Sequence, residues 1–338
     1  MNLRILLTTV FLLKFVSCEE LVNCNKVHDT FNVCKKNGVL VFVNETINES
    51  GLSITDSDIT EIAPNAFQDL DIAELRLNFN GRPVKLYPAS FEGLHKVETL
   101  VIQWTEFSPQ YKLFDALSAL RSLTISNCQV GDLIHGTFYS LSRLRELYLN
   151  YNNISTLTYY QNTFDIALGS VTNLWLDHNQ LSNIEPNVFF TLTSLRKLHL
   201  NNNRLKTLLP GTFHGIGNVW VVELQYNELT SIPKNLFNEL HRLTHLYLHH
   251  NKISSIESGA FDGLNLHVLT LSVNKLTIIS SSMFTGLRAQ DLSLAFNDIS
   301  RVDDNTFKEV GLDKIVFHDN NCTVDKERWG LSNETVVQ

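Results

Sequence analysis

The sequence of 338 residues lacks the features that mark membrane proteins and enzymes. Beyond the first eighteen residues, no stretch approaches the roughly 18 consecutive apolar residues that a membrane-spanning helix needs. The last segment, LSNETVVQ, is polar, which argues against a C-terminal lipid-anchor signal. G-x-S-x-G, H-E-x-x-H, C-x-x-C and phosphate-cradling glycine loops are all missing. We therefore expect no membrane span, no lipid anchor, no catalysis and no cofactor.

Positive charge is scarce, with 27 lysine and arginine residues against 35 aspartate and glutamate residues. The resulting net charge of −8 at pH 7 gives no electrostatic reason to expect nucleic acid as a partner. The hydrophobic content of 43% and charged content of 18% are typical of a folded globular chain.

Residues 1–18 have the order of a secretory signal peptide. Arg4 precedes the apolar run ILLTTVFLL, and the small residues Ser17 and Cys18 place cleavage before Glu19. Five Asn-x-Ser/Thr sequons are consistent with passage through the secretory pathway. They start at Asn44, Asn48, Asn153, Asn321 and Asn333. We therefore expect a soluble, secreted glycoprotein in the extracellular space.

A repeat of the form L-x-x-L-x-L-x-x-N-x-L organises almost the whole chain. Its sixth position holds Ile54, Leu77, Ile102, Ile125, Leu149, Leu176, Leu200, Leu224, Leu248, Leu271, Leu294 and Phe317. A period near 24 residues predicts a solenoid, because one turn cannot bury its own apolar face and must stack on its neighbours. We expect a cap at 19–50, eleven or twelve repeats at 51–321, and a short C-terminal cap and polar tail at 322–338. The interval between Leu149 and Leu176 has about three extra residues and predicts a loop at Tyr159 and Tyr160.

Two further repeat positions have structural explanations. The ninth position holds Asn80, Asn152, Asn179, Asn203, Asn227, Asn251, Asn274, Asn297 and Asn320, and a buried amide there can satisfy backbone groups of adjacent turns. Cys128 occupies the same position, where it is predicted to be a small buried thiol. The recurring phenylalanines predict a stacked aromatic spine on the convex side. They are Phe67, Phe91, Phe138, Phe164, Phe189, Phe213, Phe237, Phe261, Phe284 and Phe307.

These motifs resemble the animal extracellular leucine-rich-repeat family, over about Gly51 to Cys322. Small secreted arthropod members and Toll-type receptor ectodomains look most similar. The resemblance implies an α/β-type leucine-rich-repeat horseshoe, with a parallel β-sheet on the concave face and short 3-10, irregular or helical segments on the convex face. It also implies binding of proteins or microbial ligands without chemistry.

The cysteines outside the repeats belong to the two ends. The Cys24 and Cys34 pair resembles a smaller version of the family's N-terminal cap. The two cysteines lie close enough in sequence to form a disulfide in an oxidising compartment. The family's C-terminal cap carries several cysteines, whereas Cys322 stands alone here. Val324, Trp329 and Leu331 are candidates to cover the last turn instead. Cys322 is either a buried free thiol or the origin of a disulfide to a second chain, giving a dimer or hetero-complex.

The variable strand positions should line the concave face and form the candidate ligand site. The fifth position of five consecutive repeats holds Tyr148, Trp175, His199, Glu223 and Tyr247, which would span about 19 Å. The eighth position is rich in rings: Phe79, Trp104, Tyr151, His178, Tyr226, His250 and Phe296. Exposed rings of this kind favour binding, although eighth-position rings stacking on each other is the structural alternative.

The segment HLYLHH suggests a metal site, but strand geometry argues against one. On a strand, His245 and His249 share a face about 13 Å apart, too far to bind one ion, so we expect no metal and place both in the candidate ligand site. The favoured function is a secreted, non-catalytic protein that binds an extracellular protein or microbial surface ligand in innate immune recognition or signalling. The alternative is a matrix or adhesion protein, or the carrier subunit of a secreted complex.

Overall fold

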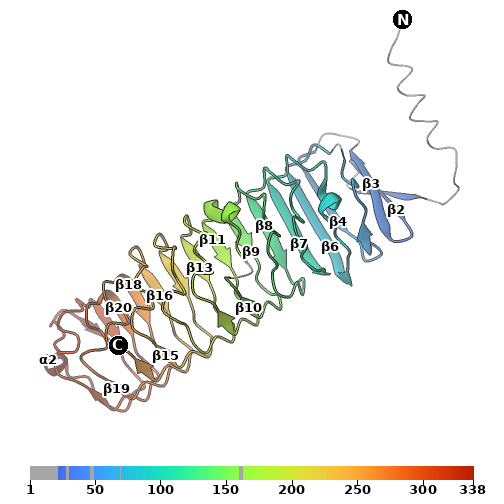
Figure 1. Ribbon diagram of the computed structural model, residues 1–338. Helices are drawn as coiled ribbons and strands as arrows, with labels where there is room; N and C mark the ends of the chain where they lie inside the picture. Colours follow the sequence, from blue (N-terminus) through green and yellow to red (C-terminus); the bar gives the residue numbers. More distant parts are fainter. Residues whose placement is uncertain (1–21, 28–29, 46–48, 69, 160–162) are drawn as a thin grey trace, which may run out of the picture.

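A computed structural model describes residues 22–27, 30–45, 49–68, 70–159 and 163–338. The turns lie side by side along an elongated solenoid, with the first strands at one end and α2 (Lys326–Trp329) at the other (Figure 1). The expected leader at 1–18, Asn48 and Tyr160 lie outside the described residues. In the described ranges no helix is long and apolar enough to cross a membrane.

One strand from each turn joins a parallel sheet, which has thirteen strands in the described part of the chain. Its strands are β4 (Gly51–Thr55), β6 (Glu74–Pro83), β7 (Thr99–Glu106), β8 (Ser122–Ser126), β9 (Glu146–Tyr148), β11 (Asn173–Trp175), β13 (Lys197–His199), β14 (Val221–Glu223), β16 (His245–Tyr247), β18 (Asn265–Thr270), β20 (Arg288–Ser293), β22 (Lys314–Val316) and β23 (Val336–Val337). Each strand pairs with the strand of the next turn, which confirms the predicted leucine-rich-repeat solenoid.

The remaining elements lie between these strands or in the N-terminal cap. Three pairs of two-residue strands form in the segments that connect one main-sheet strand to the next. They are β10 (Thr156–Leu157) with β12 (Asn183–Ile184), β15 (Ser231–Ile232) with β17 (Ser255–Ile256), and β19 (Ile278–Ile279) with β21 (Arg301–Val302). Two 3-10 helices, η1 (Pro88–Phe91) and η2 (Ile166–Ser170), occupy turns between strands. The second lies in the long interval between Leu149 and Leu176.

The buried side chains of one turn show why the leucine pattern produces this fold. Alternation along β13 sends Leu198 into the core, while its neighbours Lys197 and His199 face outward. Leu195, Leu200, Leu205, Leu208, Phe213 and Ile216 of the same turn are at most 3% exposed. Neighbouring turns present the same residues, so the apolar face of each turn is covered by the turns on either side.

The ninth-position asparagines form the predicted ladder through the central and C-terminal turns. Asn203 is 8% exposed, and its amide donates to the carbonyls of Leu176 and Leu200 at 2.9 and 3.0 Å. Its Oδ1 accepts from the backbone N–H of Leu181 at 3.0 Å. Cys128 is fully buried, as expected, and burial raises the pKa of its thiol to about 12. The ladder satisfies backbone groups where the chain leaves the sheet.

The phenylalanine spine is present and longer than the sequence pattern suggested. Phe237 lies between Phe213 and Phe261, with ring centroids 5.6 and 6.0 Å away. Phe114 joins the row between Phe91 and Phe138, although the repeat alignment had missed it. All of these rings are almost completely buried, which supports a packing role.

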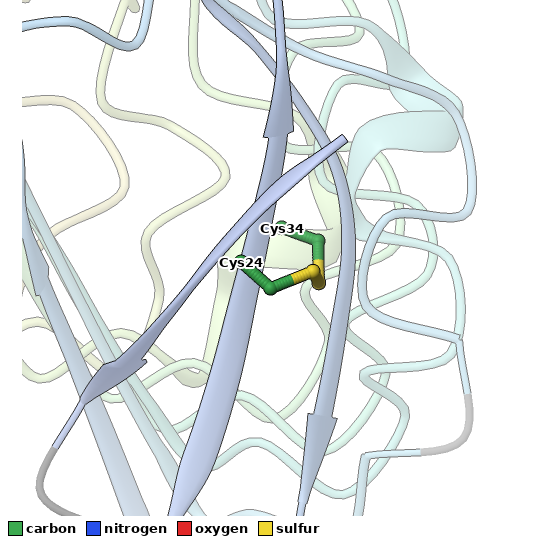
Figure 2. The surroundings of a disulfide bond; sticks show 2 residues. All are labelled: Cys24 and Cys34. Atoms are coloured by element: carbon green, nitrogen blue, oxygen red, sulfur yellow. A yellow bond between two sulfur atoms is a disulfide. The ribbon is translucent and has the colours of Figure 1, made fainter. Parts of the chain in front are cut away.

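The N-terminal cap is a small sheet of β1 (Asn23–Val27), β2 (Phe31–Lys36), β3 (Val39–Glu45) and β5 (Glu61–Ile62), in that order. A disulfide joins Cys24 to Cys34 across the antiparallel pair β1 and β2 (Figure 2). Lys35, on β2, forms an ion pair with Asp56 at 2.5 Å. The disulfide therefore stabilises the cap itself, and the ion pair connects the cap to the first turn.

The last turn is covered by Trp329, Leu331 and a final strand. Trp329 is 3% exposed and packs against Phe307 and Phe317, with ring centroids 6.2 and 4.8 Å away. Leu331 is buried, and Val324 packs partly against the core. The tail that looked merely polar contains β23, which pairs in parallel with β22.

The turn that carries β6 departs from the predicted alignment by one residue. Phe79 was placed among the outward eighth-position rings, and Asn80 in the ladder; both placements are wrong. Phe79 is fully buried, whereas Asn80 is exposed and adopts a φ of 52°. Most of the other eighth-position residues share this left-handed conformation, for example Trp104 and Tyr151 at 54° and 56°. Burying the phenylalanine ring outweighs keeping an asparagine in the ladder, so the strand register shifts between Asn78 and Arg82.

Candidate functional site

The five fifth-position residues of the central turns lie abreast on the exposed face of the sheet. The strand register pairs Tyr148 with Trp175, Trp175 with His199, His199 with Glu223, and Glu223 with Tyr247. We call these five residues the central strip. All five are half-buried, because their neighbours on the same face cover part of each side chain. Residues separated by about 100 positions in sequence thus form one continuous surface.

The first three rings of the central strip stack face to face. Tyr148 and Trp175 have ring centroids 3.9 Å apart and an interplanar angle of 13°. Trp175 and His199 follow at 5.1 Å and 2°. The flat faces of the Trp175 ring are therefore turned toward its neighbours in the stack, and its edge is left for a ligand. Stacking also restricts the rotamers, which lowers the entropy lost on binding.

A contact between His199 and Glu223 continues the strip beyond the stack. His199 Nδ1 lies 2.9 Å from Glu223 Oε2. Burial by itself would raise the pKa of the Glu223 carboxyl, but the hydrogen bond and charge of His199, together with Gln225 and Lys197, lower it overall. Glu223 is therefore held as a carboxylate. On its other side, burial and the charge of Glu223 raise the pKa of Tyr247, which keeps that phenol protonated and able to donate.

Three buried polar atoms beside the stack have no hydrogen-bond partner. They are His199 Nε2, Gln225 Oε1 and Asp177 Oδ1. Asp177 and Gln225 occupy the seventh repeat position, which also faces outward but was not considered in the sequence analysis. Comparing the seventh residue of every repeat in the sequence would have found both residues. Unsatisfied buried groups are rare in folded proteins, and they leave hydrogen-bonding capacity beside the central strip.

His245 and His249 flank the end of the strip. Their rings lie 6.2 and 6.3 Å from the ring of Tyr247. Burial, followed by the charge of His267, lowers the pKa of His245. Burial and the charge of His250 likewise lower the pKa of His249, against the opposing effect of Glu223. Both groups are thus neutral at pH 7. Among the described residues, no group of three or more His, Cys, Asp or Glu side chains is arranged to hold a metal ion.

The eighth-position rings pair with one another at the edge of the sheet. Tyr151 stacks on His178, and Tyr226 on His250, each with ring centroids 4.3 Å apart. Tyr151 and Tyr226 remain 47% exposed, so the pairs also present aromatic surface to solvent. The eighth-position rings therefore stack on each other, which is the structural alternative to ligand binding. Their exposed surface is still accessible to a ligand.

Known proteins share both the repeat and the fold. The leucine-rich-repeat family model matches residues 118–161, 169–229 and 218–276. These matches agree with the leucine-rich-repeat fold of the chain. A solved leucine-rich-repeat assembly, the octameric complex of latrophilin 3, Unc5D and FLRT2, contains a chain that superposes with a TM-score of 0.64 at 16% identity, covering 95% of this chain and 92% of that one. An internalin from Listeria monocytogenes superposes with a TM-score of 0.57 at 17% identity, covering 84% of this chain and 77% of the internalin.

Curated animal proteins match parts of the chain. Lumican of Gallus gallus is 32% identical over 113 residues, which is 31% of this chain and 30% of lumican. Podocan-like protein 1 of Mus musculus is 30% identical over 198 residues, or 57% of this chain and 32% of the relative. The matched region therefore spans about a third of the length of these relatives. Lumican, podocan-like protein and mimecan are secreted matrix proteins, and this group of relatives contains no enzymes.

The other predicted modification sites lie away from the central strip. Asn153, Asn321 and Asn333 are exposed, and Asn44 is half-buried. Cys322 is also half-buried and packs partly against the core, and this burial raises the pKa of its thiol. A raised pKa leaves less reactive thiolate at neutral pH. The free thiol and the disulfide to a second chain both stay predictions for Cys322.

Proposed function

We propose that this leucine-rich-repeat protein is secreted and binds an extracellular protein through the exposed face of its central sheet. The observation that carries the proposal is the central strip, in which three stacked rings lead to the contact between His199 and the Glu223 carboxylate. Tyrosine and tryptophan are the residue types most enriched at energetic centres of protein interfaces. Rigid backbone pairing holds them in place, so little entropy is lost when a partner docks.

The stacked geometry favours a protein ligand over a bare sugar. A sugar ring packs against the flat face of an aromatic side chain, but the faces of Trp175 are turned toward Tyr148 and His199. The exposed ring edges, the Glu223 carboxylate and the donor of Tyr247 instead offer mixed apolar and polar contacts. Such a mixture is typical of protein interfaces.

Matrix or adhesion function is the alternative to immune recognition or signalling, and the matrix proteins among the curated relatives support it. The secreted matrix relatives lumican and podocan-like protein 1 match the repeat region at about 30% identity. A role in organising other extracellular proteins requires the same binding face and no catalytic group. The sequons at Asn44, Asn153, Asn321 and Asn333 would carry glycans in a secreted product, which treatment with an N-glycosidase would reveal as a mass decrease.

The test compares two half-buried aromatic residues of the central strip with two exposed aromatic residues outside it. Immobilised wild-type protein captures partners from the extracellular fluid or matrix of the source tissue, and the affinity of a recovered partner is then measured. Trp175→Ala with Tyr247→Ala should weaken binding at least 30-fold, since interface hot spots each contribute about 2 kcal/mol. Tyr139→Ala with Phe190→Ala is the matched control, because these rings are 51% and 45% exposed outside the strip. Unchanged affinity in the strip variant, or an equal loss in the control, would reject the proposed face.

A further inference from the structure

A second surface feature lies at the edge of the sheet where the strands begin. It is a pocket of about 480 Å³ lined by Arg121, Ser142, Arg143, Arg145, Ser170, Thr172, Ser194 and Arg196. Four of these residues immediately precede strands β8, β9, β11 and β13. The lining contains four guanidinium groups and four hydroxyl groups, and no carboxylate. In a chain with a net charge of −8, this is a strong local reversal of charge.

Backbone hydrogen bonds hold the pocket in a fixed row. The N–H of Arg145 donates to the carbonyl of Arg121, that of Thr172 to Arg145, and that of Arg196 to Thr172, each at 2.8 Å. Four successive turns therefore place these residues side by side, over roughly 14 Å at the usual strand spacing of about 4.8 Å. The row is too long for one small anion and suits a ligand with anionic groups repeated along its length.

Most of the positive charge in the pocket is available to a ligand. Arg121 Nε lies 3.3 Å from Glu98 Oε2, so part of its charge is already compensated. Arg143, Arg145 and Arg196 form no ion pair with any described residue and are exposed. The Arg196 guanidinium lies 5.2 Å from the centre of the Trp220 ring, a cation–π contact that orients it. Arginine stays charged at all physiological pH values and can bind a sulfate group through two parallel hydrogen bonds.

We propose that this arginine pocket binds a sulfated polysaccharide chain. Guanidinium groups would contact the sulfates, and the serine and threonine hydroxyls would contact sugar hydroxyls. The site is separate from the central strip, because it lies at the start of the strands and uses none of the strip residues. One molecule could therefore hold a protein partner on its sheet and a polyanionic chain along the sheet edge.

Two other polyanionic partners fit the pocket less well. Single-stranded nucleic acid is usually bound by basic residues interleaved with several aromatic platforms for the bases. No aromatic residue lines this pocket, and the neighbouring Trp220 ring is in contact with the Arg196 guanidinium. An anionic lipid surface is usually bound by exposed basic residues next to apolar side chains that insert between the lipids. The pocket is concave and its lining is polar, so it offers no such insertion.

The experiment measures binding of heparin oligosaccharides of defined length to the full secreted chain at about 0.15 M salt. Arg143→Ser with Arg145→Ser and Arg196→Ser should weaken binding at least 30-fold. It should also reduce the slope of log affinity against log salt by about two to three, because each lost ionic contact releases roughly one fewer counterion. Desulfated heparin should bind neither protein. The matching charge change away from the pocket, Lys206→Ser with Lys234→Ser and Lys275→Ser, should leave binding within about twofold.

Each alternative outcome is decisive. No heparin binding by the wild-type chain, or an equal loss in the lysine control, overturns the proposal. So does tighter binding to single-stranded oligonucleotides or to phosphatidylserine vesicles than to heparin. If the triple serine variant fails to fold, Arg143→Lys with Arg145→Lys and Arg196→Lys retains the charge and should still weaken binding several-fold, because lysine lacks the two-pronged sulfate contact. Unchanged heparin affinity in that variant also counts against the site.

Discussion

In the central turns, the main-sheet strands β9, β11, β13, β14 and β16 are three residues long, whereas β6 and β7 near the N-terminus have ten and eight residues. The difference follows from how each region satisfies its backbone. The side chains of Asn203 and the equivalent asparagines form hydrogen bonds with the backbone groups where the chain leaves the sheet. In the first turns, Thr105 stands at the ladder position, and pairing instead continues from Arg82 and Pro83 to Thr105 and Glu106. Loss of the asparagine is thus compensated by a longer strand.

The same comparison explains where the candidate site lies. Short strands of equal length and constant register put equivalent side chains directly opposite each other, which allows the close stacking of Tyr148, Trp175 and His199. The longer, shifted pair β6 and β7 breaks this correspondence at Phe79. Regularity of the ladder is therefore a condition for a continuous binding strip.

Removing one ladder asparagine should have the largest effect. Asn203→Ala leaves the buried N–H of Leu181 without its partner, which costs about 1–3 kcal/mol. It also removes one of the two amide donors to each of the carbonyls of Leu176 and Leu200, at about 1 kcal/mol for each lost hydrogen bond. We expect the free energy of unfolding in urea to fall by about 3 kcal/mol or more. Thr105→Val removes only the hydrogen bond to the Arg82 carbonyl and should cost about 1 kcal/mol. Equal losses for the two variants would contradict the proposed difference between the regions.

Opening the N-terminal cap should have the next largest effect. The disulfide closes a separation of ten residues, and replacing Cys24 and Cys34 by serine should cost about 2–3 kcal/mol. Because turns of a solenoid contact only their neighbours, amide exchange should accelerate in β1 to β4 and stay unchanged in β13 to β16. Uniform acceleration along the chain would show that the cap and central turns unfold as one unit.

Acidification should destabilise the central turns through their histidines. The pKa values of His245 and His249 are lowered by burial, so below the ordinary value of 6.5 the unfolded chain takes up protons that the folded chain does not. Stability is therefore complete above that value and falls as the pH drops toward the folded pKa values. The lowered pKa of Glu223 adds a further loss below 4.5. His249→Gln should flatten the decline of the unfolding temperature between about pH 7.5 and pH 5, whereas replacement of the exposed His95 should not.

The two free cysteines should differ in reactivity with an alkylating reagent, which is the smallest effect. Burial raises the Cys128 pKa to about 12, so it should react only after unfolding, while half-buried Cys322 reacts slowly in the folded chain. Whether Cys322 forms a disulfide to a second chain is tested by non-reducing electrophoresis beside Cys322→Ser. Single-chain mobility for both samples would reject the covalent dimer or hetero-complex.

The constant 24-residue interval allowed the solenoid, the strand register and the central strip to be predicted from sequence. Three features escaped, each for a physical reason. The slip at Phe79 depends on whether burying a ring or completing the ladder is more favourable, a balance that the repeat pattern does not contain. The strand at Val336 forms only because the preceding turn offers an unpaired edge. The outward seventh-position side chains Asp177 and Gln225 become notable only through their missing hydrogen-bond partners.

Side-chain footprinting by hydroxyl radicals, with and without a captured protein partner, tests the central claim most directly. It reports the solvent exposure of individual aromatic and histidine side chains in the intact secreted chain. The account predicts that a partner protects Tyr148, Trp175, His199 and Tyr247 together and leaves the control rings Tyr139 and Phe190 unchanged. Protection of the control rings with full labelling of the four strip residues would place the partner elsewhere and contradict the account.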